Sequence, residues 1–231
     1  MNALHDWLSQ LQYEKLLDVL IVVAASLLCI TVHETCHGYV AYRLGDPTAK
    51  NAGRLTLNPL KHIDLVGLLM MAVAHFGWAK AVPVNPGYFK HYKRDMAITA
   101  AAGPVSNVVL AALALFLYSI AYWGYWTLNQ PEWMSYVLYF LQYVAVLSAG
   151  LAVFNLFPIP PLDGSKILFA FLPSRAYQWV LRYERFGFVL LLVAVWTGLL
   201  DTPLYFLRNG LLDGLERICY WPFDVLNTLA G

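Results

Sequence analysis

The feature that most constrains this chain is a long apolar run, Leu16–Leu44, broken in its interior mainly by a polar cluster at His33–His37. A run of this length can cross the hydrocarbon core of a bilayer, which is about 30 Å thick. Ionisable side chains within such a run are costly, because hydrocarbon does not solvate them. The run therefore predicts a membrane helix that carries a functional polar group.

The composition extends this interpretation to the whole chain. Of its 231 residues, 60% are hydrophobic and 13% are charged. The charged fraction is about half that of an ordinary soluble domain, and a soluble fold could not cover so much apolar surface. The net charge of +1 gives no support to nucleic-acid binding. The sequence thus predicts an integral membrane protein that has the lipid bilayer as its partner and no nucleic-acid partner.

Further apolar runs predict additional spans at Met96–Trp123, Met134–Phe157 and Phe186–Leu200. The tail Leu204–Leu229 is amphipathic, as expected of an interfacial helix or a marginal fifth span. Small residues at the start of the second span, Ala100–Gly103, allow helix backbones to approach closely. The N-terminus lacks the pattern of a cleaved signal peptide, so we expect the first helix to stay in place as an anchor.

The segment between the first two spans has a different character. It mixes turn residues with two short pieces of β-like sequence, Gly53–Pro59 and Lys80–Pro86. The apolar stretch Leu65–Phe76 between them is short for a span and fits a re-entrant or interfacial piece. The predicted fold class is therefore an all-α polytopic membrane protein with a small membrane-associated β element between the first two core helices.

Basic residues indicate the orientation in the membrane. Eight of the 15 Lys and Arg residues lie between the first two spans or at their edges, and the positive-inside rule places this segment in the cytoplasm. The loop Ser174–Arg185, which also carries arginines, is expected to return to the same side. We therefore expect the polar cluster of the first span to open toward the cytoplasm.

The polar cluster reads His-Glu-Thr-Cys-His. Positions i and i+4 of a helix differ by about 40° around its axis, so His33 and His37 share a face and can hold one Zn²⁺. Glu34 is offset by about 100° and can take a proton from a water on the metal. The bare motif also arises by chance in soluble proteins. Three ionisable groups inside an apolar span favour a metal site over an ordinary polar patch.

A catalytic zinc needs a third protein ligand and an open position. The best candidate is Asp163, in the motif NLFPIPPLDGSKIL, Asn155–Leu168, which follows the third span. The prolines of this motif prevent a helix and force an extended approach. The other interpretation is that Asp163 caps a helix starting near Ser165. Beside His33 and His37, we favour the ligand role.

Taken in order, these motifs resemble the site-2 protease family of intramembrane zinc metalloproteases. The resemblance rests on HETCH in the first span, the GRLTLNP and KAVPVNP pieces, the AAGPVSN helix, and the N-x-x-P-x-P-P-L-D-G motif. It covers about Leu20–Leu168, and its last motif is highly specific. The resemblance implies a three-helix catalytic core plus additional spans, and one Zn²⁺ per chain. It implies that the metal ligands are His33, His37 and Asp163, and that Glu34 is the general base.

The resemblance also implies roles for two asparagines. Asn155 is expected beside the metal, binding substrate or the developing oxyanion, and Asn107 matches the family's Gly-Pro-x-x-Asn helix and is expected to help position the site. The other interpretation of each is an intramembrane Asn that only bonds a neighbouring helix.

The function implied by the resemblance is hydrolysis of peptide bonds in or near transmembrane segments of membrane proteins, by an enzyme of the cell membrane. We expect one integral-membrane peptidase domain over residues 1–231, with a catalytic core at about 16–168 and C-terminal spans and an interfacial segment at about 169–231. No stretch is long enough for an inserted PDZ domain, so a compact form is expected.

Other classes of protein fit the sequence less well. A membrane metal transporter, or a metal-binding protein without proteolytic activity, would favour several charged sites along a path and internal repeats, and neither is seen. A haem protein is disfavoured because His33 and His37, one turn apart, cannot lie on opposite faces of a haem. A catalytically silent scaffold would not need the complete set of His33, Glu34, His37 and Asp163.

Overall fold

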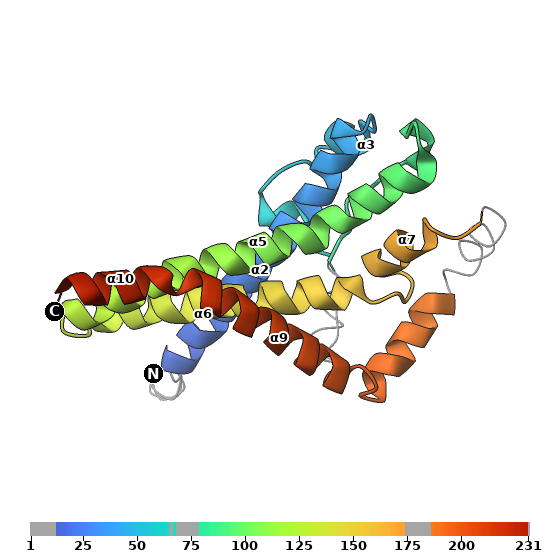
Figure 1. Cartoon of the computed structure of the whole chain (residues 1–231). Helices are drawn as coiled ribbons and strands as arrows, with labels where there is room; N and C mark the ends of the chain where they lie inside the picture. Colours follow the sequence, from blue (N-terminus) through green and yellow to red (C-terminus); the bar gives the residue numbers. More distant parts are fainter. Residues whose placement is uncertain (1–12, 65–66, 68–78, 174–185, 231) are drawn as a thin grey trace, which may run out of the picture.

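The computed structural model describes residues 13–64, 67, 79–173 and 186–230 (Figure 1). The predicted loop Ser174–Arg185 and nearly all of the predicted re-entrant stretch Leu65–Phe76 lie outside these residues. Every regular element of the described part is helical.

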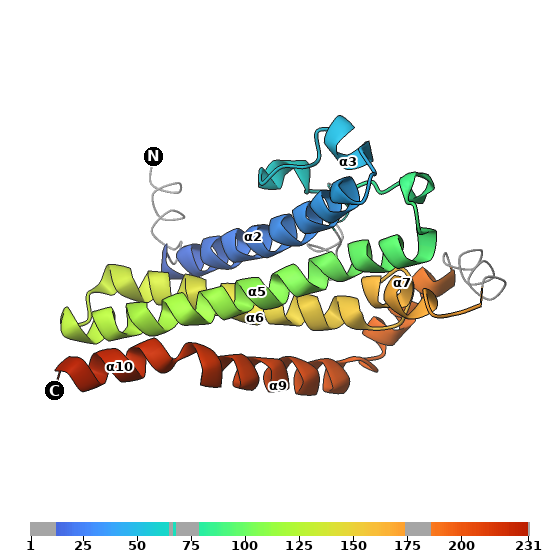
Figure 2. The same cartoon turned by 45° about the horizontal axis from the view of Figure 1, so that its top comes forward.

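Three long helices form the body of the molecule: α2 (Tyr13–Arg43), α5 (Tyr92–Thr127) and α6 (Glu132–Leu156). Each is long and apolar enough to cross a bilayer, which confirms the first three predicted spans and makes the chain an integral membrane protein. The helices lie side by side along the length of the molecule (Figures 1 and 2).

Small side chains line the contacts between these helices. The core shared by α2, α5 and α6 includes Ala25, Cys29, Ala114 and Ala145, all of them almost completely buried. Small residues let backbones approach closely, which is how helices associate in lipid, where apolar burial gives little driving force. Ser148 of α6 donates a hydrogen bond to Cys29 Sγ at 3.1 Å, so its hydroxyl is satisfied inside this core.

The C-terminal region differs from the predicted fourth span. Within the described residues, the helix Phe186–Trp196 rises about 16 Å at 1.5 Å per residue, roughly half of the bilayer core. It is bent by 85° from the segment Asp201–Leu229, and only the two segments together are long and apolar enough for a span, so the predicted fourth span is at most a broken one. The segment after the bend forms α9 (Asp201–Cys219) and α10 (Trp221–Ala230). These helices pack along α5 and α6 on the side away from α2 (Figure 2).

The described residues of the segment that joins α2 to α5 form short helices: α3 (Thr48–Asn51), η1 (Pro59–Lys61) and η2 (Pro86–Tyr88). Neither Gly53–Pro59 nor Lys80–Pro86 forms a strand, so the predicted β element is wrong for the described part of this segment.

The backbone groups that a β ladder would need are bonded elsewhere. Thr56 O accepts hydrogen bonds from Thr35 Oγ1 at 2.8 Å and from His62 Nε2 at 2.9 Å. Lys80 O accepts one from the guanidinium of Arg54 at 2.6 Å. Side chains therefore donate hydrogen bonds to backbone carbonyls of each β-like piece separately, and the two pieces do not pair with each other.

The return of the chain after α6 brings α7 (Asp163–Phe169) against the end of α6. Helix α6 stops at Leu156 because the prolines that follow lack the N–H that a helix requires. The first turn of α7 then lies directly on the last carbonyls of α6. A Cβ atom added to Gly164 would be 2.1 Å from Leu156 O and 2.6 Å from Phe157 O. Glycine is therefore required at this position by space.

We predict that Gly164→Ala destabilises the protein by about 1–3 kcal/mol, because the neighbouring atoms are backbone and cannot rotate away. The measurement is the thermal unfolding midpoint in detergent. Gly210→Ala is the matched control: it lies within α9, a Cβ there meets nothing within 4 Å, and alanine is expected to stabilise a helix by about 0.5–1 kcal/mol. Equal midpoints for the two variants would contradict the close contact at Gly164.

Candidate metal centre

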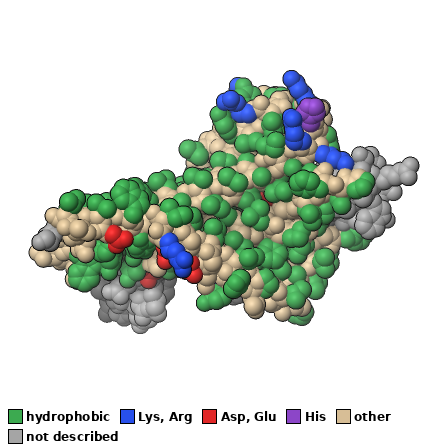
Figure 3. Space-filling model, viewed as in Figure 1, with side chains coloured by type: hydrophobic (Ala, Val, Ile, Leu, Met, Phe, Trp, Pro, Cys, Tyr) green, Lys and Arg blue, Asp and Glu red, His purple; other side chains and the backbone are tan. Residues whose placement is uncertain are grey.

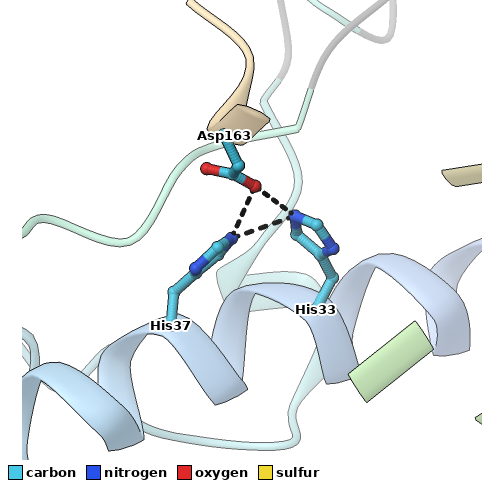
Figure 4. A group of neighbouring side chains, drawn as sticks. All are labelled: His33, His37 and Asp163. Carbon is cyan, nitrogen blue, oxygen red and sulfur yellow. Dashed lines mark hydrogen bonds and ion pairs between the residues drawn. The ribbon is translucent and has the colours of Figure 1, made fainter. Parts of the chain in front are cut away.

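Three side chains from two separate helices converge on one point (Figure 4). His33 and His37 project from one face of α2, and their Nε2 atoms lie 3.0 Å apart. Asp163, the first residue of α7, places Oδ2 at 3.3 Å from His33 Nε2 and at 3.0 Å from His37 Nε2. One ligand atom from each residue lies within 4.8 Å of the others. The structure thus brings together the three residues that the sequence singled out as metal ligands.

The site is shielded from solvent, with His33, His37 and Asp163 only 5%, 8% and 8% exposed. His37 Nδ1 lies 2.7 Å from Thr99 O of α5. A carbonyl can only accept, so Nδ1 carries the proton and Nε2 is left with its lone pair facing the cluster. His33 Nδ1 has no hydrogen-bond partner among the described residues. The tautomer of His37 is therefore the one that a metal ligand needs.

Asp163 is held in its ionised form. Burial alone would raise the pKa of its carboxyl, but the contacts with the imidazoles of His33 and His37 and the nearby charge of Lys166 hold that pKa well below its usual range. Lys166 Nζ lies 3.7 Å from Asp163 Oδ1, so the two carboxylate oxygens have different partners. Oδ2 faces the imidazoles as an anionic ligand atom.

Helix α5 borders the site through Gly103, where only backbone atoms face the imidazoles. A Cβ atom added to Gly103 would lie 2.3 Å from His37 Nε2 and 2.6 Å from His33 Cε1. The space beside the imidazoles is therefore kept free by the absence of a side chain at this position. Two imidazole nitrogens and one carboxylate oxygen are the ligands of a catalytic zinc with three protein donors and one open position. The donor set and the cradle at Gly103 both fit a zinc ion.

Glu34 lies next to this cluster but outside it. One carboxylate oxygen, Oε2, accepts a hydrogen bond from the backbone N–H of Val82 at 2.8 Å. The carboxylate is half-buried, and it lies on the same helix as the two histidines. No sequence pattern indicates this contact, because Val82 belongs to a segment far away in the chain.

The two asparagines are not part of the cluster. Asn155 donates from Nδ2 to Leu151 O of its own helix at 3.0 Å. Asn107 is completely buried one turn after Gly103, and neither polar atom of its side chain has a hydrogen-bond partner among the described residues. The structure therefore places Asn155 at the end of α6, two residues before the proline turn, and Asn107 in the core next to the site.

Sequence reasoning missed two backbone contributions to this site, the carbonyl of Thr99 and the N–H of Val82. A backbone donor or acceptor is not tied to a particular residue type, so no sequence pattern could have predicted these two contacts. The signal that was available is the run of small residues Ala100–Gly103, which indicated a close helix approach without showing what it approaches.

We predict that Gly103→Ala weakens zinc binding by about 10–100-fold, the range seen when metal ligands are displaced indirectly. The added methyl would overlap both imidazoles, so they must move apart. Zinc content and the Kd for zinc, measured in detergent, test this. Gly124→Ala in the same helix is the matched control, because its Cβ would make an ordinary contact of 3.7 Å with Met134. Unchanged zinc affinity in Gly103→Ala would rule out the cradle.

Comparison with known proteins agrees with this geometry. A Bacillus subtilis protein named "Putative zinc metalloprotease YwhC" is 36% identical over 197 residues, which cover 85% of this chain and 90% of that protein. A Mycolicibacterium smegmatis protein named "Putative zinc metalloprotease Rip2" is 30% identical over 211 residues, which cover 89% of this chain and 73% of that protein. No solved structure gives a significant match. Residues 21–195 match the family described as Peptidase family M50. The chain therefore belongs to peptidase family M50, the site-2 protease family that its motifs resemble.

Proposed function

We propose that this protein is an intramembrane zinc metalloprotease that holds one Zn²⁺ per chain between His33, His37 and Asp163. The observation that carries the proposal is that three possible ligand atoms lie within 4.8 Å of one another, two of them on a helix apolar enough to cross a membrane. Buried histidines and a buried carboxylate are costly in that setting, and a metal accounts for all three.

Bound zinc would supply a Lewis acid that polarises a carbonyl and lowers the pKa of water. The chain itself supplies the proton transfer. Glu34 follows His33 directly on α2, and its Oε1 is the carboxylate oxygen not bonded to Val82. We assign to Glu34 the role of general base, accepting a proton from the attacking water and passing it to the leaving amine.

We propose transmembrane segments of membrane proteins as the substrates. A peptide bond inside a helix is hydrogen-bonded and wrapped by side chains, so the helix must open before hydrolysis. Opening in hydrocarbon leaves amides without partners, each at a cost of several kcal/mol. A site buried at the end of an apolar span suits substrates that already lie in the same bilayer.

The two asparagines are proposed as substrate-binding and positioning groups. Asn155 is the residue before Leu156, and the carbonyl of Leu156 faces Gly164, the residue after Asp163, so Asn155 lies at the end of α6 that is nearest to the candidate metal centre. Asn107 is proposed to position the site, since a buried amide with no partner among the described residues is costly unless water or substrate reaches it.

We propose that the protein lies in the cell membrane and that its site opens toward the cytoplasm. Lys and Arg side chains gather at one end of the molecule, over α3 and the start of α5 (Figure 3). This end includes the exposed side chains of Arg43, Lys50, Lys90 and Arg94. The positive-inside rule assigns such an end to the cytoplasm. We also propose a single peptidase domain over residues 1–231, with the catalytic core at about 16–168.

We predict that Glu34→Gln retains zinc but lowers cleavage of a model transmembrane substrate by about 10²–10⁴-fold or more. The amide keeps the shape of the carboxylate but cannot accept the proton. Glu216→Gln, an exposed position on α9, is the matched control and should cleave normally. Near-normal turnover by Glu34→Gln would remove this residue from the mechanism, whereas absence of cleavage by the wild-type protein would favour a metal-binding or transport role.

We also predict that cleavage depends on residues that weaken the substrate helix. Within a helix, Gly costs about 1 kcal/mol and Pro about 3 kcal/mol relative to Ala, and either lowers the cost of local opening. Replacing such residues by Leu in a model substrate should slow cleavage strongly without reducing membrane insertion. The test compares cleavage rates in liposomes at equal levels of inserted substrate. Equal rates would show that helix opening is not part of the reaction.

A further inference from the structure

An extended segment, Lys80–Asn85, crosses α2 beside the candidate metal centre, and we call it the strap. The N–H of Val82 donates to Glu34 Oε2 at 2.8 Å. The Val82 side chain is buried, and its Cγ1 would lie 3.0 Å from a Cβ added to Gly38, one turn along α2 from Glu34. The strap therefore meets α2 twice, once through a backbone hydrogen bond and once through a tight apolar contact.

Buried polar groups fix the first end of the strap. The guanidinium of Arg54 is almost completely buried, and its Nη2 donates to Lys80 O at 2.6 Å and to Ala81 O at 3.4 Å. The N–H of Lys80 donates to His62 O at 2.9 Å. Two carbonyls and one N–H directly before Val82 are thus held in place.

A buried carboxylate fixes the other end. Asp46 is completely buried, and its Oδ2 accepts a hydrogen bond from the N–H of Asn85 at 2.6 Å. Its Oδ1 accepts a second hydrogen bond from the N–H of Thr48 at 2.9 Å. Asp46 follows the end of α2 by three residues, so it ties the strap to the same helix that carries Glu34.

Two buried charged side chains are more than a loop of this length needs to hold its own conformation. A buried guanidinium or carboxylate is costly unless its hydrogen bonds are well placed. Here the hydrogen bonds of Arg54 Nη2 go to strap carbonyls, and one of the three that Asp46 accepts comes from a strap N–H. The Val82 N–H lies between these two anchors and points at a functional carboxylate.

We propose that Arg54 and Asp46 are positioning residues that hold the strap so that the Val82 N–H fixes the orientation of the Glu34 carboxylate. One oxygen of Glu34 is then committed to Val82, and the other is free to accept a proton. This inference rests on the proposed role of Glu34 as general base. Arg54 and Asp46 would act on catalysis through the strap, without touching substrate or metal.

The direct test removes the Val82 N–H. Val82→Pro keeps an apolar side chain but has no hydrogen to donate. We expect kcat to fall by about 10–100-fold, the effect of misplacing a reacting group, with KM, zinc content and the unfolding midpoint close to those of wild type. Ala81→Pro is the matched control, since it places the same ring one residue earlier, where the lost N–H has no partner among the described residues. A decrease in kcat for Val82→Pro that is no larger than the decrease for Ala81→Pro would overturn the proposal.

A second measurement does not depend on activity. In the full-length protein, hydrogen–deuterium exchange of a peptide covering residues 80–85 should be faster in Glu34→Ala than in wild type, because the Val82 amide loses its acceptor. Arg54→Ala should also speed this exchange and should lower kcat, whereas Arg43→Ala, an exposed arginine of equal charge, should change neither. Unchanged exchange in both Glu34→Ala and Arg54→Ala would show that the strap is not held as described.

The two proposals can fail separately. If Glu34→Gln cleaves normally, the general-base assignment fails, and with it the inference that the strap serves catalysis. If Glu34→Gln is inactive while Val82→Pro and Ala81→Pro behave alike, only the strap inference fails.

Discussion

Two imidazoles on one face of an apolar helix must be matched by polar partners, and the rest of the structure is arranged around that requirement. His33 and His37 would each be costly in hydrocarbon by themselves. Asp163 supplies a carboxylate oxygen that faces both Nε2 atoms, and the carbonyl of Thr99 accepts a hydrogen bond from His37 Nδ1. These partners come from α7 and α5, so the position of both helices relative to α2 is set by the needs of one polar cluster.

Close backbone contacts make that arrangement possible. Gly103 brings the backbone of α5 against the imidazoles, and Gly164 brings α7 against the carbonyls at the end of α6. Small residues such as Ala25 and Ala145 do the same between the spans. In lipid, helices associate through packing and hydrogen bonds, and both of these interactions require close contact between the helices. An added methyl group at Gly103 or Gly164 would therefore push these helices out of the contacts that bring the site together.

The sequence was sufficient for the first three spans and for singling out His33, His37 and Asp163, because each depends on a local pattern. An apolar run is visible over its own length, and two histidines four residues apart share a helix face whatever surrounds them. The β-like pieces were misleading for the opposite reason. Their alternation predicts strands, but Arg54 and His62 take the carbonyls that a ladder would use. The bend after Trp196 and the contact of Val82 with Glu34 are tertiary features, and no local pattern encodes them.

The order of the elements along the chain has a consequence for how the protein is made. Helices α5 and α6 both separate His37 from Asp163 in the sequence. During synthesis, α2 enters the bilayer with its histidines well before the third ligand has been translated. The metal centre can be completed only after α6 is inserted and the chain has turned back at its prolines. With the proposed ligand set, hydrolytic capacity would be acquired only at the last step of core assembly, so a partly inserted chain would not cut its neighbours at the insertion machinery.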